Sequence, residues 1–148
     1  MRIVLQRVSE ASVVIENEIH NKIEKGLLIL LGIEESDEKK DADYLIQKIS
    51  NMRIFGDEEG KMNLSIQDIK GEFLVISQFT LYANTKKGNR PSFISAAKPE
   101  IAIPLYEYFL ENLKISSNLI VKAGVFGADM KVGLINDGPV TIMLESKY

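Results

Sequence analysis

The chain of 148 residues has no cysteine and a single histidine. Without cysteine there is no disulfide framework, no thiolate nucleophile and no Cys/His cluster of the kind that binds zinc. A serine-hydrolase triad would have to use His20, but that residue lies beside a polar turn at Asn17-Glu18, and no Gly-x-Ser-x-Gly elbow is present. An enzyme built from this chain must therefore work with hydroxyl groups, backbone amides and shape.

Long apolar runs, an excess of positive charge and phosphate-binding glycine loops are also missing. No apolar run approaches the ~20 residues needed to cross a bilayer, and the amino terminus lacks the features of a secretory signal. The formal charge of −3 argues against a broad nucleic-acid surface, which would be strongly positive. No Walker-type or dinucleotide-binding glycine motif occurs. We expect a cytoplasmic protein with no membrane partner, folded as a single domain over residues 1–148.

Hydrophobic patterning predicts short strands and two helices. The most apolar run, Gly26 to Ile33, should be a central strand. Before it, two runs separated by Ser9-Glu10 and a third run after Asn17-Glu18 predict an antiparallel meander at the edge of a sheet. Further strands are expected at residues 73–76, 119–123, 130–135 and 140–144, the last two joined by a turn at Asn136-Asp137-Gly138-Pro139.

Two stretches have the spacing of an amphipathic helix. In the first, Ser36 is the expected N-cap, and apolar residues from Ala42 to Met52 form one buried stripe. The second covers roughly Glu100 to Leu113. Because proline lacks an amide proton, we expect its regular part to begin near Ile103, with Pro104 in the first turn.

The segment from Phe73 to Tyr82 is the strongest candidate for a site. Its apolar half has the pattern of a strand buried on both faces, and it runs into the sequence Ser77-Gln78-Phe79-Thr80-Leu81. Polar side chains there stand on a rigid support at the rim of the core, where binding sites are commonly placed. The alternative is an ordinary strand end whose hydroxyl groups bond to a neighbouring loop. Taken alone, the segment leaves both interpretations open.

A basic loop follows this segment. Asn, Gly and Pro residues between Ala83 and Pro91 predict a loop, and it carries Lys86, Lys87 and Arg90 within five residues. A charge cluster on a loop is usually a solvated surface. Its nearness in sequence to Thr80 makes a phosphate contact the competing interpretation.

Five short motifs in the chain resemble those of the D-aminoacyl-tRNA deacylase family, in the family's order and over nearly the whole length. The principal pair is Ser77-Gln78-Phe79-Thr80-Leu81 and Asn136-Asp137-Gly138-Pro139-Val140-Thr141. The supporting matches are Gln6-Arg7-Val8 with Ala11-Ser12-Val13, Arg90-Pro91-Ser92-Phe93, and Phe126-Gly127-Ala128-Asp129-Met130.

The resemblance implies a homodimer with a three-layer mixed α/β fold, rich in antiparallel strands and with two main helices. It implies hydrolysis of the ester that joins a D-amino acid to the 3′ end of tRNA, with mischarged glycyl-tRNA as a further substrate and with no metal or organic cofactor. In the family, the Ser-Gln-Phe-Thr segment forms the pocket for the aminoacyl-adenosine. That role falls here on Ser77, Gln78, Phe79 and Thr80.

The same resemblance assigns the remaining substrate-binding residues. The family's Gly-Pro peptide is cis and reaches into the pocket of the partner subunit as a chirality filter, which implies that role for Gly138 and Pro139. Phe126, Met130 and Arg7 are implied to contact the substrate. From the residues alone, Phe126 and Met130 are ordinary core residues. Gly138-Pro139 is then an ordinary turn, in which a cis peptide bond is uncommon.

Two mechanisms of ester hydrolysis stay open, and so do two other functional classes of protein. An aminoacyl ester is already reactive, so backbone amides near Phe79 and Thr80 could stabilise the oxyanion while the neighbouring ribose hydroxyl assists. Thr80 as a covalent nucleophile is the alternative, although no base in the sequence is evident to activate it. A general small-ester hydrolase using Ser77 or Thr80, or a non-catalytic RNA-binding module, would account for the same segment.

Overall fold

The computed structural model describes residues 1–147. It contains two long helices, a short 3₁₀ helix and eight strands. The strands are β1 Arg2–Ile15, β2 Glu18–Ile23, β3 Gly26–Gly32, β4 Phe55–Gly56, β5 Met62–Leu64, β6 Glu72–Ser77, β7 Val121–Ala123 and β8 Lys131–Glu145. The helices are α1 Lys39–Asn51, the 3₁₀ helix η1 Phe79–Tyr82 and α2 Pro99–Ser117. Within the described residues, no helix is long and apolar enough to cross a membrane.

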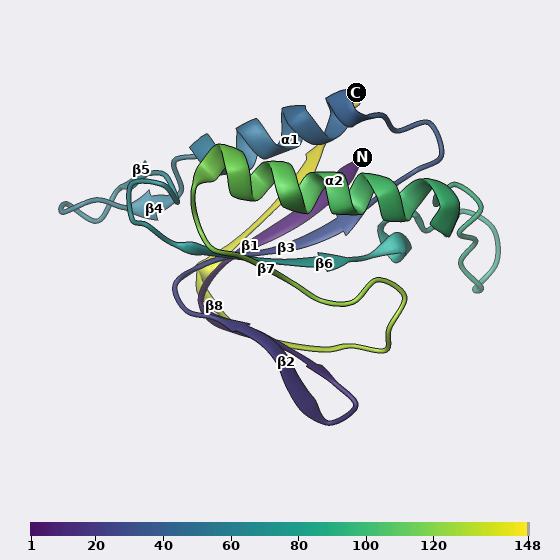
Figure 1. The fold of residues 1–148 in the computed structure, drawn as a ribbon, viewed down its shortest axis with the longest axis horizontal. Coiled ribbons are helices and arrows are strands. Elements are labelled where there is room, and N and C mark those ends of the chain that lie inside the picture. The colour runs from purple at the N-terminus through teal and green to yellow at the C-terminus, as the bar shows by residue number, and fades with distance from the viewer. Residues whose placement is uncertain (148) are drawn as a thin grey trace.

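One six-stranded sheet organises the molecule, in the order β2-β1-β3-β6-β7, with β8 paired to β1 (Figure 1). The pairs β3/β6 and β6/β7 are parallel and the others antiparallel. The prediction that residues 26–33 form a central strand is confirmed, because β3 lies between β1 and β6. Glycine at position 26 allows β6 to approach, since a Cβ there would lie 1.8 Å from the Glu72 carbonyl oxygen.

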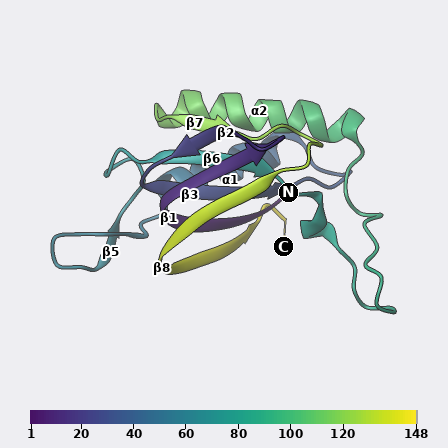
Figure 2. The same cartoon turned by 90° about the horizontal axis from the view of Figure 1, so that it is seen from below.

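The sheet separates two apolar cores. On one face, α1 and α2 lie side by side over the sheet, as Figures 1 and 2 show, and enclose the larger core around Phe55, Phe73 and Phe109. On the other face, β1, β2 and β8 curl round a smaller core that includes Val13 and Leu74. The mixed α/β fold with two main helices is therefore confirmed.

The curled sheet is nearly closed by contacts between β2 and the β7 region. The side-chain amide of Asn21 donates to the Ala123 carbonyl at 2.6 Å. The ammonium group of Lys122 donates to the Lys22 carbonyl at 2.7 Å. These side-chain bonds join two sheet edges that make no backbone ladder with each other among the described strands.

Helix α1 is present where its apolar stripe predicted it, but the expected N-cap is wrong. The helix begins at Lys39 with Glu38 as its N-cap residue. The Asp41 carboxylate accepts the backbone N–H of Glu38 at 2.8 Å and so satisfies the entry to the helix. Ser36 lies outside the helix, where its hydroxyl accepts a bond from Lys147 Nζ at 2.9 Å.

Helix α2 also starts earlier than predicted. Pro99 occupies its first turn, where a missing amide proton costs nothing, and the helix continues through Pro104. Pro104 is exposed, and α2 is tied to the sheet by its buried face. The expectation that regular helix begins near Ile103 is therefore wrong, because packing of that face outweighs the one lost hydrogen bond. The helix ends at Ser117, and the C-cap residue Asn118 is left-handed with φ 55°.

The predicted turn at residues 136–139 is wrong too. Both halves of β8 pair antiparallel with the same strand β1, so the chain does not reverse. Gln6 pairs with Thr141 and Val8 pairs with Asn136, so two steps along β1 face five steps along β8. The additional residues form a bulge that stands out from the sheet. Likewise Ser9-Glu10 does not interrupt β1, which runs unbroken from Arg2 to Ile15.

Candidate functional site

The polar end of β6 opens into a pocket of about 280 Å³. Strand β6 stops at Ser77, and the chain turns immediately into η1. The backbone N–H of Gln78 donates to the Leu31 carbonyl at 2.8 Å and anchors this turn to β3. The walls come from the end of β3, the β6–η1 junction, the start of α2 and the segment before β8. They comprise Leu31, Ile33, Ile76, Ser77, Gln78, Phe79, Ala97, Ala102, Phe126, Gly127, Ala128, Asp129, Met130 and Val132.

This pocket brings together five of the residues that the motifs singled out: Ser77, Gln78, Phe79, Phe126 and Met130. Residues about 50 positions apart in the sequence thus face one cavity, because β6 and the segment before β8 meet at the same end of the sheet.

Thr80 lies beside the pocket and is tied to it through Gln78. The Gln78 side-chain amide donates to Thr80 Oγ1 at 2.5 Å, and both side chains are accessible. The first bond of η1 runs from the Leu81 N–H to the Gln78 carbonyl at 3.2 Å. The N–H groups of Phe79 and Thr80 precede that bond and have no acceptor within the turn.

Aromatic residues shape the walls of this pocket. Phe79 is 56% exposed, and its ring meets that of Phe93 edge to face, with ring centroids 5.2 Å apart. On the inner side, Phe126 packs against Tyr106 with centroids 5.7 Å apart. The Tyr106 hydroxyl donates to the Val75 carbonyl at 3.2 Å, and burial raises its pKa to about 12. Tyr106 is therefore neutral near pH 7 and acts as a fixed support behind Phe126.

Arg7, Gly138 and Pro139 lie away from the pocket of their own chain. On β3, Leu31 pairs with Ser77 of the pocket, whereas Leu27 pairs with Arg7. The pocket and Arg7 are therefore four residues apart along β3, about 13 Å. The Gly138–Pro139 peptide is cis, as the family resemblance implies. Arg7 holds this bulge, since its Nε donates to the Asp137 carbonyl at 2.7 Å and its Nη1 to the Ile54 carbonyl at 2.6 Å.

Asn136 is a residue of this bulge to which the sequence analysis gave no role. Its Oδ1 accepts the Val140 N–H at 2.7 Å, and its Nδ2 donates to Thr141 Oγ1 at 3.0 Å. The side chain therefore spans the base of the bulge and sets the positions of Gly138 and Pro139 between its ends. The available sequence signal is general, because asparagine side chains in turn-like segments commonly bond to nearby backbone.

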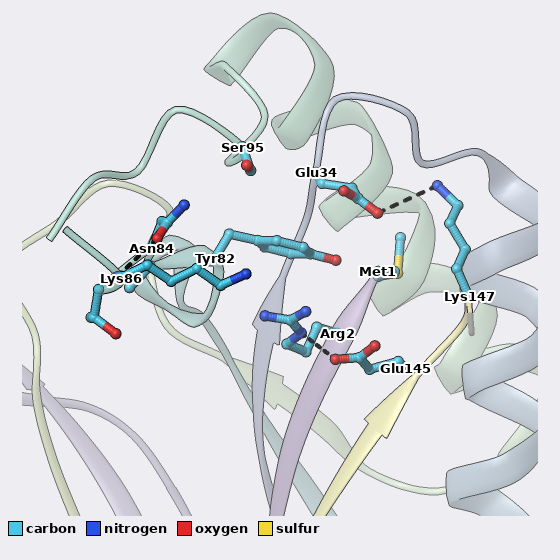
Figure 3. Close-up of a pocket in the computed structure, with 11 residues that line it drawn as sticks. Met1, Arg2, Glu34, Tyr82, Asn84, Lys86, Ser95, Glu145 and Lys147 are labelled. Atoms are coloured by element: carbon cyan, nitrogen blue, oxygen red, sulfur yellow. Dashed lines mark hydrogen bonds and ion pairs between the residues drawn. The ribbon is translucent and has the colours of Figure 1, made fainter.

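The basic loop lies beside η1, and its ends are pinned. Asn84 and Ser92 exchange two backbone hydrogen bonds of 2.7 and 3.0 Å, which close the loop that carries Lys86, Lys87 and Arg90. All three cations are exposed. Lys86 alone among them lines a second pocket, shown in Figure 3, which the sequence analysis did not predict.

The charged side chains of residues 1–147 form no group of three or more His, Cys, Asp or Glu residues that could hold a metal ion. The polar groups at the β6–η1 pocket are a hydroxyl, a carboxamide, a carboxylate and backbone amides. Such a set can orient an ester and donate hydrogen bonds to a developing oxyanion.

Known proteins resemble this chain over its whole length. A D-Tyr-tRNA(Tyr) deacylase family model matches residues 4–145. The D-aminoacyl-tRNA deacylase of Flavobacterium psychrophilum is 60% identical over 147 residues, which is 99% of this chain and 98% of that protein. The protein of the same name from Bacteroides thetaiotaomicron is 61% identical over 147 residues, with the same coverage.

Solved structures agree with these matches. A structure named c-Myc DNA Unwinding Element Binding Protein has a TM-score of 0.94 and 44% identity, and the match covers 100% of both chains. A probable eukaryotic D-amino acid tRNA deacylase has a TM-score of 0.83 at 15% identity, covering 97% of this chain and 98% of that one, which shows a shared fold.

These matches define a hydrolase that acts on the ester of aminoacyl-tRNA. The chain belongs to the D-Tyr-tRNA(Tyr) deacylase family. Its activity is that of a D-aminoacyl-tRNA deacylase, and the family indicated by the sequence motifs is confirmed.

Proposed function

We propose that the β6–η1 pocket receives the 3′-terminal aminoacyl-adenosine and is the place where its ester is hydrolysed. The observation that supports this most strongly is the convergence of Ser77, Gln78 and Phe79 with Phe126 and Met130 on one pocket. A substrate ester held at the mouth of that pocket lies next to the free N–H groups of η1. The reaction takes place in the cytoplasm, where aminoacyl-tRNA is made and used.

The proposed chemistry uses the reactivity of the substrate. A water oxygen adds to the ester carbonyl carbon, the carbonyl oxygen becomes an oxyanion, and the N–H groups of Phe79 and Thr80 donate to it. The bond from carbon to the ribose oxygen then breaks, and that oxygen takes up the proton that the attacking water has lost. The adjacent ribose hydroxyl donates a hydrogen bond to the leaving oxygen. Gln78 holds the Thr80 hydroxyl at 2.5 Å and so sets the shape of the site.

We further propose that a second copy of the chain completes the site. Gly138 and Pro139 lie about 13 Å along the sheet from the pocket of their own chain, so they can act only in another subunit's pocket. There their carbonyl groups hold the substrate amino group and fill the space that an L side chain needs. Excluding one hand sterically serves many amino acids, whereas a tailored pocket would serve few.

The same filter admits glycine, which has no side chain on either hand. We therefore include mischarged glycyl-tRNA among the substrates. We also propose that Lys86, Lys87 and Arg90 contact phosphates near the acceptor end; the pinning of their loop directly after η1 supports this. These are short-range contacts, in keeping with a net charge of −3.

Four substrates test the proposal: a D-aminoacyl-tRNA, the matching L-aminoacyl-tRNA, glycyl-tRNA and a simple aryl ester. We expect the purified protein to cleave the first and third and to spare the second and fourth. Faster cleavage of the aryl ester than of D-aminoacyl-tRNA supports a general ester hydrolase instead. Tight tRNA binding without hydrolysis supports a non-catalytic RNA-binding module.

A separate test concerns the nucleophile. If water attacks with help from the ribose, Thr80→Ala should slow hydrolysis by about tenfold or less, the worth of one hydrogen bond. A substrate that carries the ester on the 3′ oxygen but lacks the 2′-hydroxyl should be inert. Single-turnover rates with both substrates measure these effects. An acyl-enzyme trapped on Thr80, or complete loss of turnover in Thr80→Ala with unchanged binding, would establish covalent catalysis in place of this mechanism.

A further inference from the structure

A second pocket, of about 350 Å³, is lined by residues that neighbour those of the β6–η1 pocket in the sequence. In three segments of the chain, residues close together in the sequence line one pocket or the other. Ile33 lines the first and Glu34 the second, Phe79 the first and Tyr82 the second, and Ala97 the first and Ser95 the second. A polymer whose last unit occupies the first pocket therefore has the second pocket immediately beside it.

One wall of the second pocket is held rigidly by Arg2 and Tyr82 (Figure 3). The Arg2 guanidinium stacks on the Tyr82 ring at 4.6 Å from its centroid. It donates from Nη1 to the Leu81 carbonyl at 2.7 Å, and its Nε lies 2.7 Å from Glu145 Oε1. Burial raises the pKa of Tyr82, so the ring is neutral at physiological pH.

The opposite wall belongs to the basic loop. The backbone N–H of Lys86 donates to Asn84 Oδ1 at 3.0 Å, which fixes the residue just beyond the pinned end of the loop. In Figure 3 the Lys86 side chain extends from this loop toward Tyr82. Within residues 1–147 its ammonium group makes no ion pair, in contrast to Arg2 and Lys147 in the same pocket.

The charges of the pocket are divided between its two sides. Lys86, with Asn84 and Ser95 near it, offers hydrogen-bond donors on the loop side. Glu34 and Glu145 offer carboxylates on the other side, with side chains 29% and 47% exposed. Arg2 and Lys147 pair with Glu145 and Glu34, so both carboxylates are already partly neutralised within the pocket. A ligand with an anionic group at one end and an amine donor at the other suits both sides.

We propose that this pocket binds the nucleotide that precedes the terminal adenosine of tRNA. This nucleotide is a cytidine, since every mature tRNA ends in the sequence CCA. Lys86 contacts the phosphodiester that joins it to the adenosine, and a carboxylate of Glu34 or Glu145 accepts the exocyclic amine of the base. The inference rests on the proposed placement of the aminoacyl-adenosine in the β6–η1 pocket.

Minimal substrates separate this pocket from the rest of the tRNA surface. We compare hydrolysis of D-aminoacyl-adenosine, the D-aminoacyl dinucleotide CpA and the D-aminoacyl dinucleotide UpA. In the wild-type protein, kcat/KM for CpA should exceed that for adenosine alone by about tenfold, the worth of one charge-assisted hydrogen bond. UpA should lose part of this advantage, because uracil has a carbonyl where cytosine has the amine donor.

Two neighbouring lysines supply a matched comparison. Lys86→Met should remove the part of the CpA advantage that depends on the phosphate contact, whereas Lys87→Met should keep the whole advantage, because Lys87 does not line the pocket. Both variants remove one positive charge from the same exposed loop, so a general electrostatic effect would act on them alike. The KM of intact D-aminoacyl-tRNA in the two variants is the second readout.

These experiments distinguish failure of the second-pocket proposal from failure of the proposed function. If the wild-type protein does not hydrolyse D-aminoacyl-tRNA, the proposed function itself is wrong. If the wild-type protein hydrolyses D-aminoacyl-tRNA but CpA has no advantage over adenosine, the pocket does not bind this nucleotide. The same conclusion follows if Lys86→Met and Lys87→Met change the CpA advantage and the KM equally. Equal rates for CpA and UpA would remove the base contact and leave only a phosphate contact, which contradicts the proposal as stated.

Discussion

Gly138 is held in a conformation that other residues rarely adopt, with φ +147°. A Cβ at this position would lie 2.8 Å from Val140 Cγ2 and 3.0 Å from Arg7 Nη2. The residue is exposed at the tip of the bulge, so the fold does not depend on it. Its surroundings instead fix where the Gly138 and Pro139 carbonyl groups lie.

Gly138→Ala should therefore displace the bulge and damage activity without unfolding the protein. Misplacing a positioning group by about 1 Å costs about 100-fold in rate, and we expect a loss of that order in kcat/KM for D-aminoacyl-tRNA. Gly56→Ala is the matched control, because a Cβ on Gly56 meets nothing within 4 Å. Wild-type rates in Gly138→Ala, with an unchanged melting temperature in both variants, would contradict the assigned role of the bulge.

At the scale of the elements, the start of α1 carries a pH-sensitive group. Burial raises the pKa of Asp41, but its backbone hydrogen bond to Glu38, its contact with Ser146 and the charges of Lys147 and the amino terminus outweigh burial and lower the pKa below 3.8. Lys147 Nζ lies 4.0 Å from its carboxylate. The ionised carboxylate is thus favoured in the folded state.

A lowered pKa in the folded state means that Asp41 stabilises the protein above its unfolded pKa of 3.8, and that this contribution disappears as the pH falls through the lower, folded value. The urea midpoint should therefore fall more steeply below pH 4 in the wild type than in Asp41→Asn, which cannot ionise. Urea titrations from pH 6 to pH 2.5 measure this. Parallel curves for the two proteins would show that Asp41 does not contribute to the acid transition.

The elements that the sequence predicted correctly are those in which local pattern and packing agree. The glycine-bounded apolar run became β3, and the apolar stripe of α1 faces the core. Predictions from local sequence pattern failed where pairing between distant strands decides the local structure. Residues 136–139 have the composition of a turn, yet both flanking segments bond to β1, so the chain bulges without reversing.

The site could be predicted only in part for the same reason. The polar residues at the end of β6 are a local signal, and the family motifs joined them to Phe126 and Met130, which the structure brings to the same pocket. No sequence pattern shows that Lys86 but not Lys87 lines a pocket with Arg2 and Glu145, because that pocket is assembled from five separate segments of the chain.

The pocket and the bulge, the two candidate parts of the active site, lie at separate places in the molecule. The β6–η1 pocket lies at the carboxyl end of β6, and the Arg7-held bulge lies about 13 Å away along β3. In a two-fold symmetric dimer, each surface patch meets the corresponding patch of the partner, so the bulge of one subunit can enter the pocket of the other and the reverse. One folded chain alone would then lack a complete site.

Heterodimers with one defect in each subunit test this arrangement. Ser77→Phe fills the pocket of one subunit, and Gly138→Ala displaces the bulge of the other. If the pocket and bulge of the same chain worked together, both sites of the heterodimer would be defective. If the bulge acts across the interface, the unfilled pocket faces the undisplaced bulge, and one of the two sites is intact. Heterodimers purified with two different affinity tags should then regain about half of the wild-type rate. The two parent proteins, measured separately, should be nearly inactive. A heterodimer no more active than its parents would show that the bulge does not complete the partner's site.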